Sequence, residues 1–180
     1  MNRLVYERFG SKKGFVRYLQ HGLVALIGGY RQFPRVRPDK GRRLVFICSG
    51  NICRSPLAEV YAASLGWRAA SCGLHCGDSY PADPRARAFA KRCGLDLDQH
   101  KTIHVTDFRF NADDLIVVME PAHLEGFQQA VGDSYQLLLA GKYCKPANPY
   151  IHDPFNCCAE YFERCEKKVM ESVRVLCGKA

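Results

Sequence analysis

LVFICSGNICRSP, residues 44–56, is the stretch that decides the fold of this chain. It begins with four apolar residues, 44–47, whose number and β-branched content are typical of a buried parallel strand. Cys48 ends this run, and after a short loop Ser55 and Pro56 have the order of a helix N-cap and a first helical position. A strand, a tight loop and a helix in direct succession predict an α/β fold.

The loop between this strand and this helix is suited to binding an anion. Gly50 and Asn51 are residue types that tolerate left-handed backbone, so successive N–H groups can point inward. The start of the helix adds the positive end of its dipole. We therefore predict a phosphate-binding loop, whose members are Ser49, Gly50, Asn51, Ile52, Cys53 and Arg54.

The two ends of the loop predict chemistry at phosphorus. A free cysteine is mostly protonated at neutral pH, but inward N–H groups, the helix end and the Ser55 hydroxyl favour a thiolate at Cys48. Arg54 can donate two parallel hydrogen bonds to phosphoryl oxygens, which a lysine cannot. A core cysteine beside a surface arginine would explain either residue alone. The agreement of strand, loop and helix start favours a nucleophilic thiolate.

These residues resemble the low-molecular-weight protein tyrosine phosphatase family, whose loop reads C-x-G-N-x-C-R-S-P. That family carries a general acid in an Asp-Pro-aromatic motif near the C-terminus, and this chain has Asp153-Pro154-Phe155, with Phe where many members have Tyr. No His stands directly before Cys48, which favours this family over other cysteine phosphatases. The resemblance covers residues 43 to about 177. It implies a four-stranded parallel sheet flanked by helices on both faces.

The resemblance also implies a mechanism. Cys48 attacks the phosphorus of an aryl phosphate monoester, Arg54 holds the phosphoryl oxygens, and Asp153 protonates the leaving oxygen. Asp153 then acts as the base that hydrolyses a phosphocysteine intermediate. We expect no metal and no other cofactor, because the loop supplies the positive charge. The spacing of Cys72, His75 and Cys76, and of Cys157-Cys158, gives no complete set of four zinc ligands.

Supporting roles follow from the same resemblance. Ser71 and His100 match the family residues that hold the loop asparagine, here Asn51, in strained geometry; a turn residue and an exposed helix-end residue are the plain alternatives. Cys53 matches a partner that traps oxidised Cys48 as a reversible disulfide, and the alternative is a small residue that fills space behind the loop. Ile52, Phe155 and the loop 74–80 are expected to form the walls of the substrate pocket.

The rest of the chain alternates between strand and helix patterns. Strands are predicted at 68–72, 115–119 and 135–139, and helices at 56–65, 83–92, 121–131 and 159–176. This alternation implies parallel strands with right-handed crossovers, and ligands then bind at the strand C-terminal ends, where Cys48 lies.

The positive charge is concentrated in the first 43 residues. They hold eleven Lys or Arg against two Asp or Glu, a net of +9, whereas residues 44–180 have a net of −1. Together with Pro34, Pro38 and Gly41, this change indicates a basic N-terminal extension, residues 1–42, and a phosphatase domain, residues 43–180.

The extension has the pattern of a basic amphipathic helix. Ser11 can cap a helix that runs to about residue 27 and carries an apolar stripe. Three alternatives stay open: the helix packs on the catalytic domain or on a second copy, lies on an anionic membrane surface, or is disordered until bound. No nucleic acid is expected, because no binding motif is present. The stripe consists of Phe15, Leu19, Leu23, Leu26 and Ile27.

The expected location is the cytoplasm, with peripheral contact at the inner membrane face. The chain has ten cysteines, no convincing signal peptide and no segment long enough to span a bilayer, and a thiolate nucleophile needs a reducing compartment. Segments 119–123 and 149–155 resemble bacterial members associated with tyrosine kinases of polysaccharide export. A phosphotyrosine protein, such as a membrane-associated tyrosine kinase, is therefore the expected partner.

Two other functions compete with this interpretation. A thioredoxin-coupled arsenate reductase shares the fold and the loop but relays oxidation through cysteines just after the third strand, where residues 119–124 contain none. A non-catalytic anion-binding or adaptor protein would not need Cys48, Arg54 and Asp153 together. We therefore expect a phosphatase.

Overall fold

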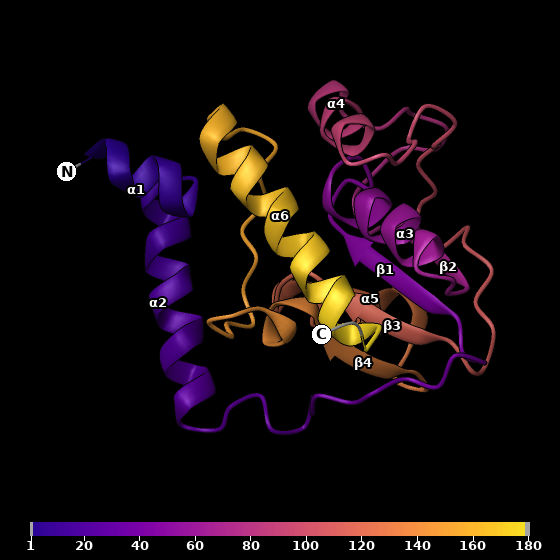
Figure 1. Cartoon of the computed structure of the whole chain (residues 1–180). Helices are drawn as coiled ribbons and strands as arrows, with labels where there is room; N and C mark the ends of the chain where they lie inside the picture. Colours follow the sequence, from indigo (N-terminus) through magenta and orange to yellow (C-terminus); the bar gives the residue numbers. More distant parts are fainter. Residues whose placement is uncertain (1, 179–180) are drawn as a thin grey trace.

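The computed structural model describes residues 2–178, and its centre is a four-stranded sheet (Figure 1). All strands are parallel, in the order β2-β1-β3-β4, and Leu44 of β1 lies opposite Ala69 of β2 and Leu115 of β3. The predicted α/β fold with a four-stranded parallel sheet is confirmed. The strands are β1 (Leu44–Cys48), β2 (Ala69–Gly73), β3 (Leu115–Val118) and β4 (Gln136–Leu139).

Helices cover both faces of this sheet, as predicted. Alternate residues of a strand point to opposite faces, so Leu44 and Phe46 pack with one core cluster and Val45 and Ile47 with the other. The first cluster includes residues of α3 (Arg54–Ser64), α4 (Pro84–Arg92) and α6 (Ala159–Leu176), and the second those of α5 (Ala122–Val131). The short helix η1 (Ala140–Tyr143) follows β4.

The start of α3 differs from the prediction. The helix begins at Arg54, its N-cap position is Cys53, and no side chain caps it. The prediction of Ser55 as N-cap is therefore wrong: Ser55 lies inside the first turn, and its hydroxyl group bonds to Cys48 and Asn51 instead. The N–H groups of this first turn are left for an anion in the loop.

The N-terminal extension forms two helices, α1 (Asn2–Phe9) and α2 (Lys12–Leu26), of which only the second was predicted. Ser11 caps α2 by accepting a hydrogen bond from the Gly14 amide at 2.8 Å. In Figure 1 these helices lie beside α6 and the loop that precedes it. The apolar stripe does not make this contact: Leu23 and Leu26 are 62% and 84% exposed.

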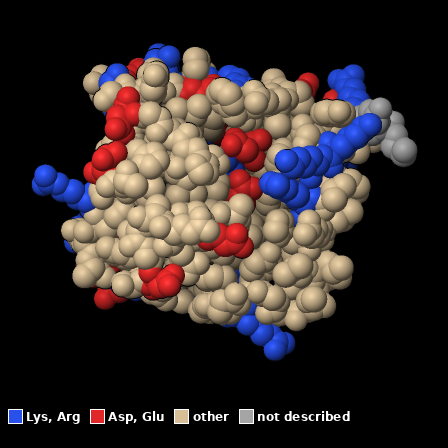
Figure 2. Space-filling model, turned by 180° about the vertical axis from the view of Figure 1, so that it is seen from behind, with Lys and Arg blue, Asp and Glu red and all other residues tan. Residues whose placement is uncertain are grey.

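The segment after α2 is tied to the catalytic part of the chain by hydrogen bonds. The Lys142 ammonium donates to the Tyr30 and Phe33 carbonyls at 3.0 and 2.6 Å. The Tyr143 hydroxyl lies 2.9 Å from the Val36 amide and 3.0 Å from its carbonyl. Figure 2 shows Lys and Arg side chains gathered at the edge of the molecule where the N-terminal helices lie. Within residues 2–178, no helix is both long and apolar enough to cross a bilayer.

Glu166 on α6 is fully buried, and its carboxyl oxygens have no hydrogen-bond partner among the described residues. Burial raises its pKa from the usual 4.5 to about 8, which Arg54 opposes only in part. The folded chain therefore holds Glu166 protonated where the unfolded chain ionises it, so stability falls as pH rises from about 4.5 to about 8.

We expect Glu166→Gln to stabilise the protein at pH 8 by a few kcal/mol, with a gain that shrinks toward pH 5. Urea unfolding at both pH values measures this difference. Glu163→Gln, on the exposed side of the same helix, is the matched control and should show no such pH dependence. A gain for Glu166→Gln that is equal at both pH values would contradict the raised pKa.

Candidate active site

The predicted anion loop starts at the C-terminal end of β1, where Cys48 is the last strand residue. Cys48 is buried, and its sulfur lies 3.0 Å from the Ser55 hydroxyl oxygen. Asn51 has a φ of +50°, so the loop uses the left-handed backbone that its sequence suggested. This geometry turns the chain around the Cys48 sulfur and leads it directly into α3.

Asn51 organises the loop through four hydrogen bonds. Its Nδ2 donates to the hydroxyls of Ser55 and Ser71, both at 2.9 Å. Its Oδ1 accepts from the Ile103 amide at 3.1 Å, and its carbonyl lies 2.8 Å from His100 Nε2. Burial lowers the pKa of His100, so at neutral pH the ring is uncharged and can donate through Nε2. The structure thus brings Ser71 and His100 to Asn51.

The direction of these bonds matters for the thiol. Because Ser55 accepts a bond from Asn51, its own proton is free to point at the Cys48 sulfur. Ser71 is oriented in the same way, since its hydroxyl donates to the Glu59 carboxylate at 2.6 Å. Two hydrogen bonds, from Asn51 to Ser55 and from Ser55 to Cys48, can therefore run in one direction and end on the sulfur, whereas the Ser71 bond runs away from it to Glu59.

Arg54 lies at the other end of the loop and is 1% exposed. Its Nη1 donates to the Ile151 carbonyl at 2.9 Å, and its Nη2 lies 2.9 Å from Asp153 Oδ2. Burial alone would lower the pKa of Arg54, but Asp153, Cys48 and Glu120 outweigh it and raise the pKa. Its Nε has no hydrogen-bond partner among the described residues, which leaves a charged donor for an incoming anion.

Glu120 and His123 also belong to this site, and the sequence analysis gave them no role in it. Glu120 Oε1 lies 3.6 Å from Arg54 Nη1 and 3.1 Å from His123 Nε2. Burial would raise the pKa of Glu120, but His123 and Arg54 lower it to about 2. His123 Nε2 also lies 3.1 Å from the Ser49 hydroxyl. Both residues follow the C-terminal end of β3, which is the signal that could have found them.

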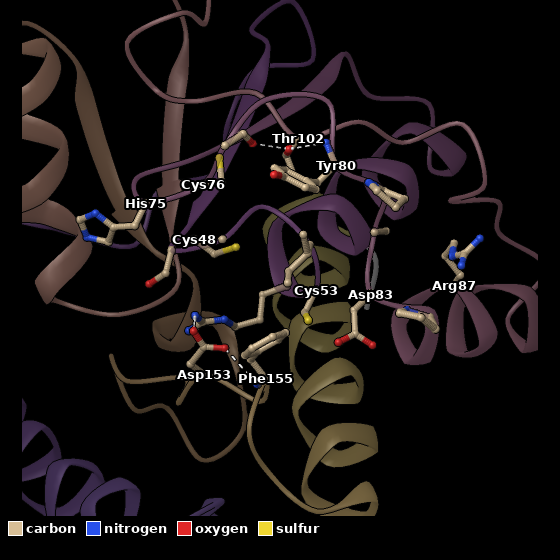
Figure 3. Close-up of a pocket in the computed structure, with 18 residues that line it drawn as sticks. Cys48, Cys53, His75, Cys76, Tyr80, Asp83, Arg87, Thr102, Asp153 and Phe155 are labelled. Atoms are coloured by element: carbon tan, nitrogen blue, oxygen red, sulfur yellow. Dashed lines mark hydrogen bonds and ion pairs between the residues drawn. The ribbon is translucent and has the colours of Figure 1, made fainter.

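A pocket of about 560 Å³ opens at the loop and contains Cys48, Arg54 and Asp153 in its lining. Figure 3 shows Cys48 and Asp153 on its walls. Asp153 comes from the loop before α6; its carboxyl group is partly exposed, and Oδ1 accepts from the Phe155 amide at 3.1 Å. The walls are largely apolar and include Ile52, Phe155 and residues of the 74–80 loop. The predicted wall residues thus line the pocket.

Cys53 also lines this pocket, and its thiol is free, like that of Cys48. Burial raises the pKa of Cys53, with added effects of Glu166 and Asp83, so this thiol is protonated at neutral pH. The reversible disulfide between the two cysteines stays a prediction. In the part of the chain that the structure describes, no three His, Cys, Asp or Glu side chains form a group that could hold a metal ion.

A small parallel sheet, an anion loop that runs from a buried thiol to a buried guanidinium, and a carboxyl group opposite them are features of the class of cysteine-dependent phosphatases. Comparison with known families agrees. The model of the family "Low molecular weight phosphotyrosine protein phosphatase" matches residues 43–180, and this chain belongs to that family. The family prediction is confirmed.

Individual relatives share about a third of their aligned residues with this chain. The chain is 35% identical over 89 residues to the probable low molecular weight protein-tyrosine-phosphatase EpsP of Ralstonia solanacearum; the match covers 48% of the chain and 61% of EpsP. It thus spans about three fifths of that relative. It is 31% identical to a low molecular weight protein-tyrosine-phosphatase of Streptomyces coelicolor, over 73% of the chain and 93% of the relative.

Solved structures resemble the catalytic part of the chain. Vibrio vulnificus Wzb in complex with benzylphosphonate is 25% identical, with a TM-score of 0.67 over 77% of this chain and 99% of that one. The tyrosine phosphatase Wzb from Escherichia coli K30, in complex with sulphate, is 26% identical with a TM-score of 0.66, over 76% and 96%.

Proposed function

We propose that this chain hydrolyses phosphotyrosine in proteins through a phosphocysteine intermediate, with residues 43–180 as the phosphatase domain and 1–42 as an extension. The observation that supports this most is the meeting of Cys48, Arg54 and Asp153 in one pocket. The sulphate and benzylphosphonate bound to the Wzb structures are anions of the kind that this pocket suits.

The first step transfers the phosphoryl group to sulfur. Arg54 and the loop amides bind the equatorial oxygens, and the Cys48 thiolate attacks phosphorus in line with the leaving oxygen. The S–P bond forms as the P–O bond to the tyrosine ring breaks. Asp153 gives its proton to the leaving oxygen, so tyrosine departs as a neutral phenol.

The second step regenerates the thiolate. Asp153, now a carboxylate, takes a proton from a water molecule, whose oxygen attacks the phosphorus of phosphocysteine. The S–P bond breaks, and its electron pair returns to Cys48, where the Ser55 hydroxyl 3.0 Å away stabilises it. Inorganic phosphate then leaves the loop.

The depth and walls of the pocket favour an aryl ester. Cys48 is 2% exposed, so a phosphoryl group must reach inward to meet the sulfur. The long phenol ring of tyrosine spans this depth, whereas serine and threonine are too short. Phe155 and Tyr80, both exposed at the rim, can pack against the ring.

The arsenate reductase alternative is not favoured. It needs further cysteines after the third strand, and residues 119–124 contain none. The adaptor alternative is not favoured either, because a binding protein does not need a carboxyl group held 2.9 Å from the arginine of the anion loop.

We further propose that the substrate is a membrane-associated tyrosine kinase of the polysaccharide-export type and that α2 binds the cytoplasmic face of that membrane. The resemblance of segments 119–123 and 149–155 to bacterial phosphatases of this kind supports the substrate. The apolar stripe of α2 supports the membrane contact, because it is exposed at residues 19, 23, 26 and 27 and the extension, residues 1–42, carries a net charge of +8.

One experiment tests both parts. An autophosphorylated kinase domain of this type is anchored to vesicles of phosphatidylcholine with or without phosphatidylserine. We expect loss of its phosphotyrosine, faster on anionic vesicles. The double variant Leu19→Ser with Leu23→Ser should lose this acceleration because it removes apolar area from the exposed stripe, while it hydrolyses a free phosphotyrosyl peptide at the wild-type rate.

Unchanged phosphotyrosine on the kinase would contradict the substrate. Equal rates on both vesicle types would contradict the membrane contact. A wild-type dimer in solution that the double variant converts to a monomer would show that a second copy, and not a membrane, covers the stripe.

A further inference from the structure

The segment that leads to Asp153 is held on one side by the N-terminal extension. Every second residue from 148 to 152 contacts α2 or its N-cap. These residues are Asn148, whose Nδ2 donates to the Tyr18 carbonyl at 3.0 Å; Tyr150, whose ring centre lies 5.1 Å from that of His21; and His152, whose Nε2 lies 3.2 Å from the Ser11 hydroxyl.

Ile151 and Asp153, which alternate with these residues, contact the catalytic arginine. The Ile151 amide donates to the Met119 carbonyl at 3.0 Å, and its own carbonyl accepts from Arg54. The Asp153 carboxylate pairs with the same guanidinium. Because these contacts alternate along consecutive residues, a displacement of the residues that contact α2 is expected to move the residues that contact Arg54. The extension and the catalytic arginine therefore share one short piece of chain.

His152, the residue next to the acid, is the centre of this contact. Its Nδ1 lies 2.6 Å from the Tyr150 hydroxyl, so both ring nitrogens have partners. The backbone at Gly10 and Gly14 packs closely against the imidazole ring. A Cβ atom at Gly10 would lie 2.7 Å from His152 Cδ2, and one at Gly14 would lie 2.8 Å from it. Glycine at these two positions is thus what lets the corner between α1 and α2 sit on the imidazole.

The main chain of His152 is fixed as well. Its carbonyl accepts a hydrogen bond from the Tyr161 hydroxyl at 3.2 Å and a weaker one from the Cys165 thiol at 3.5 Å, both from α6. Burial lowers the pKa of His152, which keeps the ring neutral, so it can donate to one of its two hydroxyl partners and accept from the other.

We infer that Ser11 and Tyr150 are positioning residues for catalysis: they hold His152 and thereby aim the carboxyl group of Asp153 at the leaving oxygen. This inference rests on the proposed role of Asp153 as general acid. The extension would then contribute to the reaction itself and not only to the location of the protein.

The test compares kcat/KM for two esters in the full-length protein. Phenyl phosphate needs protonation of its leaving group, and 2,4-dinitrophenyl phosphate does not. We expect Ser11→Ala and Tyr150→Phe to lower kcat/KM for phenyl phosphate about tenfold, because small misplacement of an acid is costly, and to change the dinitrophenyl ester less than about twofold. Inhibition by inorganic phosphate should stay at the wild-type value, since the anion loop is untouched.

Two further variants sharpen the result. Ser11→Thr keeps the hydroxyl that caps α2 and meets His152, so it should behave like the wild type. Gln20→Ala changes an exposed residue of the same helix and should also leave both substrates unchanged.

Equal losses on both esters, or weaker inhibition by phosphate, would overturn the inference in favour of a purely structural role. Unchanged kinetics in Ser11→Ala and Tyr150→Phe would overturn it as well. The variant Asp153→Asn distinguishes failure of the inference about Ser11 and Tyr150 from failure of the proposed acid role of Asp153. If Asp153→Asn alters the ratio of the two esters while the positioning variants do not, only the inference falls; if Asp153→Asn leaves the ratio unchanged, the acid role falls and the inference falls with it.

Discussion

Cys48→Ser is expected to abolish turnover while the protein still binds inorganic phosphate. The hydroxyl group that replaces the thiol is a far weaker nucleophile at neutral pH, and the side chain that the structure places in hydrogen-bond contact with it, the Ser55 hydroxyl, is not a base. The anion cradle itself is made by Arg54 and by backbone amides, which the substitution leaves in place. We expect a loss of at least about 10³-fold in kcat, equivalent to roughly 4 kcal/mol of activation free energy.

Hydrolysis of para-nitrophenyl phosphate measures the loss, and calorimetry with inorganic phosphate measures the binding. Cys93→Ser is the matched control, because Cys93 is an exposed cysteine away from the pocket and should keep full activity. Near-normal turnover in Cys48→Ser would refute the proposed nucleophile. Loss of both turnover and phosphate binding would instead point to a collapsed loop, which the circular dichroism of the variant would reveal.

Asp153→Asn is expected to slow esters of weakly acidic phenols most. The amide keeps the size of the side chain and an oxygen that can accept from the Phe155 amide, so the loop should hold its shape. It cannot give up a proton to the leaving oxygen. General acids contribute about 10²–10⁴-fold, so kcat/KM for phenyl phosphate should fall by about 10² or more. The dinitrophenyl ester, whose phenol leaves without protonation, should change little.

A plot of log kcat/KM against the leaving-group pKa for a series of aryl phosphates measures this effect, and its slope should become steeper in Asp153→Asn. Asp107→Asn, at an exposed position that does not line the pocket, should keep the wild-type slope. Parallel lines for Asp153→Asn and the wild type would contradict the role of Asp153, whatever the absolute rates.

The fold followed closely from the sequence because local signals and long-range packing agree. The apolar runs at 44–47 and 115–119 are buried on both faces, and alternate residues of β1 enter the two clusters. The Asp83-Pro84 signal also marks the start of α4, where Asp83 accepts from the Arg85 amide. Each of these elements is set by a few adjacent residues, which is what a sequence pattern can report.

The site residues and the packing face that the sequence did not reveal are set by contacts between segments that are remote in the sequence. Glu120 and His123 gain their role only because β3 lies next to β1, which places the end of each strand at one edge of the sheet. The N-terminal helix α2 was predicted, but its packing face was not. Small residues and polar contacts, at Gly14, Tyr18 and Ser11, make the interface, and they carry no periodic apolar signal.

More than half of the chain separates the thiol at Cys48 from the carboxyl group at Asp153. The loop that binds the anion lies between β1 and α3, but its arginine is held by the Ile151 carbonyl, and the residue before the proton donor is held by α6, near the other end of the described chain. During synthesis, the nucleophile therefore emerges from the ribosome long before its acid. Contacts between such remote segments form late in folding. A nascent chain of this protein would therefore gain the carbonyl that holds Arg54 and the acid that serves the reaction from the same late segment.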